Sequence, residues 1–347
     1  MAVRLPLVGL ALLAARLSVR GVEDWLLKDP LLFHQRAAQV QRSGPIDVSN
    51  DPAAMAVFGD LVDRVRRLQG PYGFSDLEVV DALEHFFWGS AAGVALELGA
   101  VDGTPARVSM TYDMEHSLNW TRILVEANPK FRRTLQRLNP SDFTVHAAIC
   151  AEERIVHFAF KAYVSGILEL METSFIQKNF PVAYHIFNTT NPPQRWDLVD
   201  WSKAQRLSTE RNRFDPVSCV PLAKVFSRAA VRHVNFFVLD VEGGELSVLR
   251  SVDWNAVKFD VLCVETEPCY RPPGYTDALT TFLAEKGYGL YASRGRNSWF
   301  IRNDFSPSAR PGVHRECFRG VESLYRNASL YRVVAFSSPE RVNQPHC

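Results

Sequence analysis

The chain has 347 residues, of which 47% are hydrophobic and 22% are charged. This length and apolar content suffice for one large core, or for one core with a small appendage, and they exclude a disordered chain. The formal net charge is +1, so no basic excess favours binding to nucleic acid, and we expect a small or neutral ligand.

The first 21 residues have the pattern of a targeting segment. Arg4 precedes an apolar run over residues 5–15, and small residues lie near Gly21. Arg16 ends this run, which is shorter than the roughly 20 apolar residues that a membrane-spanning helix needs. Residues 1–21 are therefore predicted to be a cleaved signal peptide, with an uncleaved anchor as the alternative. No later segment is expected to cross a membrane.

Two further features suit the secretory pathway, in its lumen or outside the cell. N-glycosylation sequons begin at three positions, Asn119, Asn188 and Asn327. An oxidising compartment would allow up to three disulfides among the six cysteines, which are Cys150, Cys219, Cys263, Cys269, Cys317 and Cys347. Their spacing shows no zinc-site pattern. Cys263 lies within an apolar run, which also fits a buried free thiol.

Residues 22–89 are predicted to form an N-terminal helical segment. Apolar side chains repeat at the period of an amphipathic helix over residues 60–68, and glycines and a proline follow. A second helix is expected to begin at Ser75 or Asp76, since either residue suits a helix cap, and to end near residue 88. The first helix either packs on the core with a solvated outer face or covers the mouth of a cofactor site.

A glycine turn follows the first strongly apolar strand. Residues 94–103 read VALELGAVDG, so the apolar run closes on Glu97 and is followed by Gly99 and Gly103. This spacing lets the backbone turn tightly and approach a ligand. A second apolar strand ends on Glu126, where nucleotide-binding βα units place the carboxylate that accepts the ribose hydroxyls. Together the two signals predict a nucleotide cofactor.

The middle of the chain continues the α/β pattern. Helices are predicted at residues 106–118 and 129–137, and strands at residues 120–126, 143–148 and 155–160. We expect His146 to be a packed strand residue rather than a ligand. Residues 161–215 mix prolines, tryptophans and a sequon. They are predicted to be an insertion that either lies over the site and shapes an acceptor pocket or forms a surface loop.

Two later strands end in acidic residues. The motif VNFFVLDVEGGE is a buried strand that ends on Asp240, with Glu242 and Glu245 around a Gly-Gly turn into a helix. The next strand, FDVLCVETE, presents Glu265 at the same edge of the sheet. Carboxylates this close need a cation, a proton or a hydrogen-bond donor. Asp240, Glu242 and Glu265 are therefore predicted to be catalytic residues or ligands of a divalent cation. Glu242 and Glu245 have an alternative role as caps of the following helix.

The last predicted elements are a helix over residues 275–285 and a hairpin. The strands of the hairpin, 288–292 and 298–302, are joined by the tight turn RGRN. A helix and a closing hairpin at the end of a doubly wound sheet distinguish methyltransferases from dehydrogenases. The predicted cofactor is therefore S-adenosylmethionine. Residues 306–347 are expected to form a C-terminal extension.

Four motifs, in this order along the chain, resemble the FkbM-type methyltransferase domain: ELGAVDG, WTRILVEANP, LDVEGGE and VLCVE. The resemblance covers residues 90–305, and LDVEGGE is its most specific part. It implies an α/β fold with a Rossmann-like, doubly wound, seven-stranded sheet of the class I methyltransferase type. The implied activity is transfer of a methyl group from S-adenosylmethionine to a hydroxyl, often on a sugar or a polyketide.

The same resemblance implies roles for individual residues. Glu97, Gly99 and Gly103 would line the methionine end of the cofactor. Glu126 would hold the ribose, and Asp240 would lie near the reacting centre. The whole implied cofactor-binding set is Glu97, Gly99, Ala100, Gly103, Glu126, Ala127 and Asp240. Val101 stands where many members of the family have asparagine, which removes one possible polar contact.

The mechanism can be argued from the chemistry of methyl transfer. The reaction is an in-line displacement on a sulfonium, so the protein has to position the acceptor and remove its proton. A sugar hydroxyl is a poor acid, and a carboxylate is a weak base unless a cation also polarises the oxygen. We therefore expect Asp240 to act as the base or as one ligand of a divalent cation.

Two functions follow from the sequence. One is an S-adenosylmethionine-dependent O-methyltransferase of the secretory pathway, acting on a hydroxyl of a glycan or a small molecule. The alternative is a non-catalytic trafficking or binding protein of the secretory pathway on the same domain, because the Star-like trafficking proteins are similar to it. The sequence specifies no oligomeric state.

Overall fold

A computed structural model describes residues 25–26, 34, 37–38, 41, 44–68, 78–104, 109–138, 142–161, 165–171, 173–187, 199, 201, 213–266, 273–315 and 318. The predicted signal peptide, two of the sequons (Asn188 and Asn327) and three of the cysteines (Cys269, Cys317 and Cys347) lie outside the described residues. No helix among the described residues is both long enough and apolar enough to cross a membrane.

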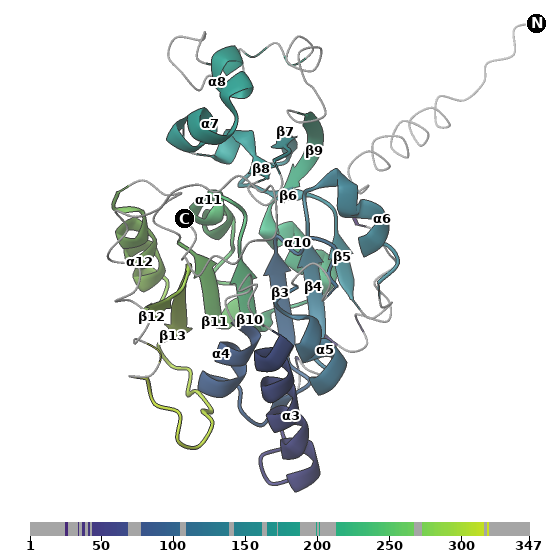
Figure 1. The fold of residues 1–347 in the computed structure, drawn as a ribbon, viewed down its shortest axis with the longest axis vertical. Helices are drawn as coiled ribbons and strands as arrows, with labels where there is room; N and C mark the ends of the chain where they lie inside the picture. Colours follow the sequence, from purple (N-terminus) through teal and green to yellow (C-terminus); the bar gives the residue numbers. More distant parts are fainter. Residues whose placement is uncertain are drawn as a thin grey trace, which may run out of the picture.

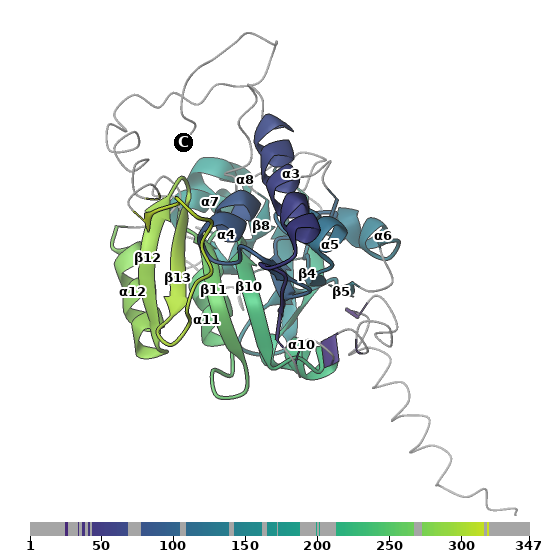
Figure 2. The same ribbon diagram turned by 90° about the horizontal axis from the view of Figure 1, so that it is seen from below.

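A seven-stranded sheet forms the centre of the molecule, in the order β12-β13-β11-β10-β3-β4-β5. Its strands are β3 (Val94–Leu98), β4 (Thr121–Val125), β5 (Phe143–Val145), β10 (His233–Leu239), β11 (Lys258–Glu265), β12 (Tyr288–Arg294) and β13 (Asn297–Arg302). Five neighbouring strands of this order, β11, β10, β3, β4 and β5, pair in parallel. The strand β13 is antiparallel to both of its neighbours, β11 and β12. Figures 1 and 2 both show β12 and β13 beside α12 at one edge of the sheet, and β5 and α6 at the other.

Helices cover both faces of this sheet, so the fold is a mixed α/β fold in three layers. The helices are α3 (Pro52–Leu68), α4 (Glu78–His85), α5 (Tyr112–Leu118), α6 (Arg132–Leu135), α10 (Leu222–Ala229), α11 (Glu245–Arg250) and α12 (Tyr275–Glu285). Apolar residues of α10, α11 and α12 pack on one face, and those of α3, α4 and α5 pack on the other. The central strands are buried on both sides, as their largely apolar sequences predict.

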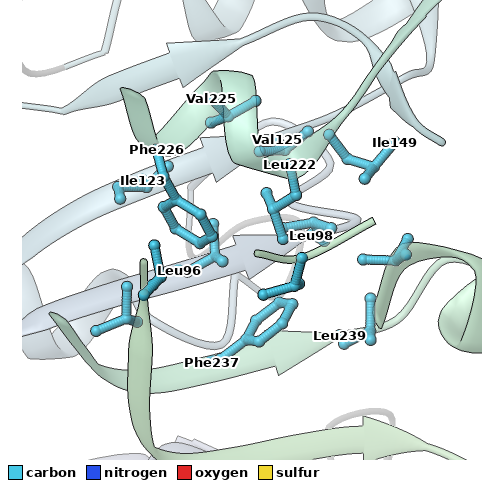
Figure 3. Packing of buried hydrophobic residues seen from close by; sticks show 14 of the residues in the cluster. Leu96, Leu98, Ile123, Val125, Ile149, Leu222, Val225, Phe226, Phe237 and Leu239 are labelled. Carbon is cyan, nitrogen blue, oxygen red and sulfur yellow. The ribbon is translucent and has the colours of Figure 1, made fainter. Parts of the chain in front are cut away.

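The strand β3 shows how the sequence divides between the two cores. Leu96 and Leu98 face the core under α10, where they meet Leu222 and Phe226 (Figure 3). Ala95, between them in the sequence, faces the opposite core. Because successive side chains of a strand point to opposite faces, a strand buried on both sides supplies apolar residues to both layers.

The helix α3 packs on the core rather than over the site. It begins earlier than the repeat over residues 60–68 suggested, because the Asp51 carboxylate accepts hydrogen bonds from Ala53 N (2.9 Å) and Ala54 N (3.2 Å) and so caps the helix. Leu61 and Val62 are buried against the sheet. Figure 1 shows α3 at the opposite end of the molecule from α7 (Thr173–Asn179) and α8 (Pro181–Phe187).

A second, four-stranded sheet has the order β6-β9-β7-β8. It contains β6 (Ala148–Ile149), β7 (Arg154–Ala159), β8 (Gly166–Ile167) and β9 (Phe214–Val220), and a short 3-10 helix, η4 (Leu168–Leu170), follows β8. Cys150 and Cys219 form a disulfide between the end of β6 and β9. Cys263 is fully buried, as its apolar surroundings in the sequence indicated.

The predicted strand over residues 143–148 is wrong as a single element. It is split between the two sheets, because β5 ends at Val145 and β6 begins at Ala148. At the break, His146 N donates to Trp25 O (2.8 Å). The His146 side chain is buried and burial lowers its pKa to about 4, which agrees with the expectation of a packed residue.

The predicted helix over residues 106–118 begins later, at Tyr112, although residues 105–108 are not described. The carboxylate of Glu97 accepts hydrogen bonds from Ser109 Oγ, Met110 N and Thr111 Oγ1. These contacts hold residues 109–111 outside the helix. The predicted helix over residues 275–285 and the closing hairpin are confirmed by α12, β12 and β13.

Candidate functional site

The ends of β3 and β10 approach each other closely at the glycine turn. Asp240 N donates to Leu98 O (3.1 Å), and Gly99 has a φ of +85°. A Cβ atom on residue 99 would lie 1.9 Å from Asp240 O, well inside contact distance. Glycine is therefore required here for two reasons, its positive φ and the close approach of the neighbouring backbone. The turn brings Asp240 to the carboxyl end of the sheet, where open α/β sheets bind ligands.

Three carboxylates meet beside this turn and form what we call the acidic cluster: Asp240, Glu242 and Glu265. One carboxylate oxygen from each lies within 4.8 Å of the others. The parallel register of β10 and β11 explains the meeting, because Leu239 pairs with Val264 and the next residue of each strand is acidic. Glu265 is 1% exposed, whereas Asp240 and Glu242 are half-buried. The sequence predicted this group, and the fold brings all three members together.

An arginine from the closing hairpin faces the acidic cluster. Arg296 Nη1 lies 3.8 Å from Glu265 Oε1, and Arg296 O accepts a hydrogen bond from Thr266 N (2.8 Å). Arg296 follows Gly295 in the two-residue turn between β12 and β13. Sequence reasoning missed this residue, because only the long-range register of β11 with β13 brings the turn to the end of β11.

Glu245, the fourth acidic residue of this region, has a structural position. Its side chain is fully buried, and Oε1 accepts hydrogen bonds from Gly243 N (3.0 Å) and Val241 N (3.3 Å). Tyr275 Oη donates to its other oxygen (2.7 Å). Glu245 therefore closes the turn between β10 and α11; it lies in the first turn of α11, but its hydrogen bonds go to the preceding turn and do not cap the helix. The turn also holds Glu242 at a φ of +56°, a conformation that side-chain-bearing residues rarely adopt.

Glu126 lies at the end of β4, on the other side of the glycine turn from the acidic cluster. Its Oε2 accepts from Val101 N (2.8 Å) and its Oε1 from Asn128 N (2.5 Å). Burial raises the pKa of Glu126 to about 7, although these backbone hydrogen bonds oppose the rise. A carboxylate has about four acceptor sites, so these hydrogen bonds do not exhaust its capacity to accept from a ligand hydroxyl. Ala127, the next residue, packs against the apolar side of the second sheet.

The remaining predicted cofactor residues face the protein itself. Glu97 is 1% exposed and binds the three donors of residues 109–111, while burial raises its pKa. Ala100 is fully buried in a small core with Leu124. A Cβ on Gly103 would lie 2.5 Å from Leu138 Cδ1. These three residues shape the turn from within, and their contact with a cofactor stays a prediction.

Part of the predicted insertion lies against the turn that carries the acidic cluster. A Cβ on Gly166 would lie 3.1 Å from Glu242 Cβ, and one on Gly244 would lie 3.1 Å from Leu170 Cδ1. Figure 1 shows the second sheet, α7 and α8 at the end of the molecule next to α11. The strand β8 and the helix η4 therefore form one wall beside the cluster.

The group of side chains at this end of the sheet has three chemical capacities. Hard carboxylate oxygens bind divalent cations such as Mg²⁺ and Ca²⁺. A half-buried carboxylate accepts a proton from a hydroxyl held against it. Three acidic groups near one arginine also attract a positively charged ligand.

Comparison with known families identifies the domain. The model of the methyltransferase FkbM domain matches residues 97–290, more than half of the chain. The chain belongs to the FkbM methyltransferase domain family. No curated protein and no solved structure matches it significantly.

The FkbM match has bounds that agree with the described site. It begins at Glu97 and ends at Leu290, so it includes the glycine turn, Glu126 and the whole acidic cluster. It lies within the predicted range of residues 90–305. Membership of the FkbM family indicates a methyltransferase.

Proposed function

We propose that this protein is an S-adenosylmethionine-dependent O-methyltransferase of the secretory pathway that methylates a hydroxyl of a glycan or a small molecule. The observation that carries the proposal is the meeting of Asp240, Glu242 and Glu265 within 4.8 Å beside the glycine turn. Family membership supplies the reaction class, and the acidic cluster supplies groups suited to a hydroxyl acceptor.

The proposal includes the finer fold class, a Rossmann-like doubly wound sheet of the class I methyltransferase type. Three features support it: β3 lies inside the sheet between β10 and β4, helices cover both faces, and an antiparallel hairpin closes one edge. The change of direction between β3 and β10 is the position at which such sheets bind their ligands.

The described residues fit S-adenosylmethionine in charge and in hydrogen-bonding capacity. This cofactor supplies a methyl group on a positively charged sulfur, and the acidic cluster offers three carboxylates against one arginine. Glu126 offers acceptor sites for the two ribose hydroxyls at the next strand end. The proposed cofactor site therefore extends from the acidic cluster to Glu126 across Gly99.

In the proposed mechanism the chain positions the acceptor and takes up its proton. Asp240 is half-buried at the end of β10, where it would hydrogen-bond the acceptor hydroxyl and receive its proton. Glu242 and Glu265 keep this region negative. Negative charge favours the binding of a positively charged sulfonium, but it opposes the loss of that positive charge. Exclusion of water by the wall of β8 and η4 would strengthen these electrostatic interactions.

The acidic cluster also fits a divalent cation as a proposed second component. Two oxygens bound to one Ca²⁺ at 2.3–2.6 Å lie at most about 5 Å apart. The separations in the cluster, all within 4.8 Å, satisfy that limit. Asp240, Glu242 and Glu265 would hold the ion, which would lower the pKa of an acceptor hydroxyl. Arg296 is the competing partner for Glu265.

The test measures transfer of a labelled methyl group from S-adenosylmethionine to methyl glycosides. We expect Asp240→Asn to lower the rate by about 100-fold or more, the usual size of a lost acid–base group. Asp63→Asn, on the exposed side of α3, is the control and should retain the wild-type rate. A metal chelator should lower the rate if the cluster holds an ion. Full activity both with chelator and in Asp240→Asn would contradict the proposed roles.

The proposed location in the secretory pathway has support from two described features. The Cys150–Cys219 disulfide suits an oxidising compartment. Asn119 is exposed at the end of α5, so its sequon is accessible although Trp120 and Thr121 are buried. Secreted wild-type protein should lose mass on treatment with a glycan-removing amidase, and Asn119→Gln should lose one glycan fewer. An identical pattern for both proteins would exclude modification at Asn119.

One observation favours the non-catalytic alternative. The Glu97 carboxylate is satisfied by Ser109, Met110 and Thr111, so its burial needs no ligand. A binding or trafficking protein would keep such a group for the fold alone. This alternative predicts that the purified chain does not bind S-adenosylmethionine.

A further inference from the structure

A histidine and a glutamate form a fixed pair on the second sheet, outside the acidic cluster. His157 Nδ1 lies 2.7 Å from Glu169 Oε1, and His157 N donates to Glu169 Oε2 (3.0 Å). Both side chains are largely buried, with exposed fractions of 13% for His157 and 7% for Glu169. Both carboxylate oxygens are thus engaged by one residue, which fixes the carboxylate and the imidazole relative to each other.

The imidazole ring is also fixed on its face. It stacks on the Trp201 ring with a centroid separation of 3.2 Å and an interplanar angle of 8°. Because an ionised carboxylate only accepts hydrogen bonds, the Nδ1 of His157 carries a proton. In the neutral ring, Nε2 is then the nitrogen with the lone pair. No hydrogen bond to Nε2 is present within the described part of the chain.

The pair is carried by the elements that form the wall beside the acidic cluster. Glu169 is the middle residue of η4, and its neighbour Leu170 contacts the turn at Gly244. The strand β8, which precedes η4, pairs with β7 and brings Gly166 against Glu242. His157 lies on β7, next to Phe158, which pairs with Ile167 of β8. The pair therefore lies on the same small sheet that contacts the acidic cluster through Gly166.

We propose that His157, fixed by Glu169 and Trp201, is an acceptor-binding residue that hydrogen-bonds a hydroxyl of a polyhydroxylated ring. The Nε2 lone pair accepts from a hydroxyl, and the stacked Trp201 ring holds the imidazole in place to do so. This inference rests on the proposed function for its placement over a methylation site. The chemistry of the pair itself does not depend on the cofactor.

The direct test follows the ring nitrogens of ¹⁵N-histidine-labelled full-length protein by NMR during titration with sugars. The probes are methyl β-galactoside, methyl β-glucoside and methyl α-mannoside, up to about 10 mM because single sugars bind weakly. Tetrahydropyran, the same ring without hydroxyls, is the ligand control. At least one glycoside should move the His157 Nε2 resonance saturably, and tetrahydropyran should not. If no glycoside moves it, the proposal is overturned.

Two variants separate binding from a structural effect. His157→Ala should abolish the saturable binding, measured by tryptophan fluorescence, whereas His185→Gln on the exposed side of α8 should keep it. If His157→Ala fails to fold, Glu169→Gln is used instead, and it should weaken binding by about tenfold because the imidazole loses its charged partner. Unchanged affinity in the variant that folds would contradict the proposal.

Calorimetry with S-adenosylmethionine distinguishes this inference from the proposed function. His157→Ala, or Glu169→Gln in its place, should bind the cofactor with wild-type affinity, because neither residue contributes to the proposed cofactor site. Sugar binding without any cofactor binding would sink the proposed function and leave a sugar-binding role for His157. Cofactor binding with no response of His157 to sugars would sink the inference alone.

Discussion

Gly99 is the residue at which the ends of β3 and β10 come closest. Replacing it with alanine would place a Cβ 1.9 Å from Asp240 O at a φ of +85°, so the two strand ends would have to separate. We expect Gly99→Ala to lower the free energy of unfolding by about 3 kcal/mol or more, as strained and overpacked sites do. Chemical denaturation monitored by fluorescence measures this change.

Gly287 provides the matched control for this substitution. Its φ is +86°, and a Cβ there would meet nothing within 4 Å. Gly287→Ala should therefore cost only the backbone penalty of the left-handed conformation, about 1 kcal/mol. Equal losses for the two variants would show that the approach of Asp240 to the turn is not what requires glycine at position 99.

Glu126 should make the stability of the protein depend on pH. Burial raises its folded-state pKa to about 7, above the value of about 4.3 for an unfolded glutamate. Its contribution to stability is therefore fully present below about pH 4.3 and is lost as the pH rises through 7. The measured quantity is the free energy of unfolding of the wild type minus that of Glu126→Gln. This difference should decrease as the pH rises from 5 to 8. A difference that stays constant over this range would rule out the raised pKa.

Residues at the ends of parallel strands were predictable, and their partners from other elements were not. Asp240 and Glu265 end two consecutive apolar runs, so their proximity follows from the pairing of those runs. Arg296 and Tyr275 reach the same region through a hairpin turn and a helix start, and no local pattern indicates this. Val101 differs in another way. From the sequence, we expected only that valine at position 101 removes a polar contact. The structure adds that this β-branched residue has a φ of +53°, a conformation that such residues rarely adopt.

Among the elements, those defined by their own sequence pattern were predicted well. The strands β3, β4, β10 and β11 are largely apolar, and α12 and the closing hairpin have clear boundaries. The start of α5 and the break between β5 and β6 depend on distant partners instead. Glu97 holds residues 109–111 out of the helix, and Trp25 takes the backbone N–H of His146. Such tertiary hydrogen bonds leave no periodic signal in the segment that they alter.

The disulfide makes the second sheet depend on redox conditions. Cys150 and Cys219 are 69 residues apart, and they enclose β7, β8, α7 and α8. Closing a loop of this length removes unfolded-state entropy worth about 4 kcal/mol. Reductant should therefore lower the denaturation midpoint of the wild type by more than that of the Cys150→Ser/Cys219→Ser double variant. The Cys263→Ala variant should respond like the wild type. A midpoint insensitive to reductant in all three proteins would contradict this role.

For the molecule as a whole, the seven-stranded sheet was predictable because strands and helices alternate along the chain. The second sheet was not, since β6 and β8 have two residues each, too few to show a periodic pattern, and β6 pairs with β9, which follows it only after α7 and α8. The second sheet forms one side of the acidic site, because Gly166 and Leu170 lie against the turn from Asp240 to Gly244.

Titration calorimetry with S-adenosylmethionine tests most directly whether the ends of β3, β4 and β10 form a cofactor site. At pH 8, above the pKa of about 7 of Glu126, we predict micromolar binding to the wild type and binding about tenfold or more weaker to Glu126→Gln, because hydrogen bonds from ribose to the carboxylate would be lost. Glu285→Gln, on the exposed end of α12, should bind like the wild type. Absence of binding by the wild type, or equal affinity in Glu126→Gln, would contradict the assignment of this site.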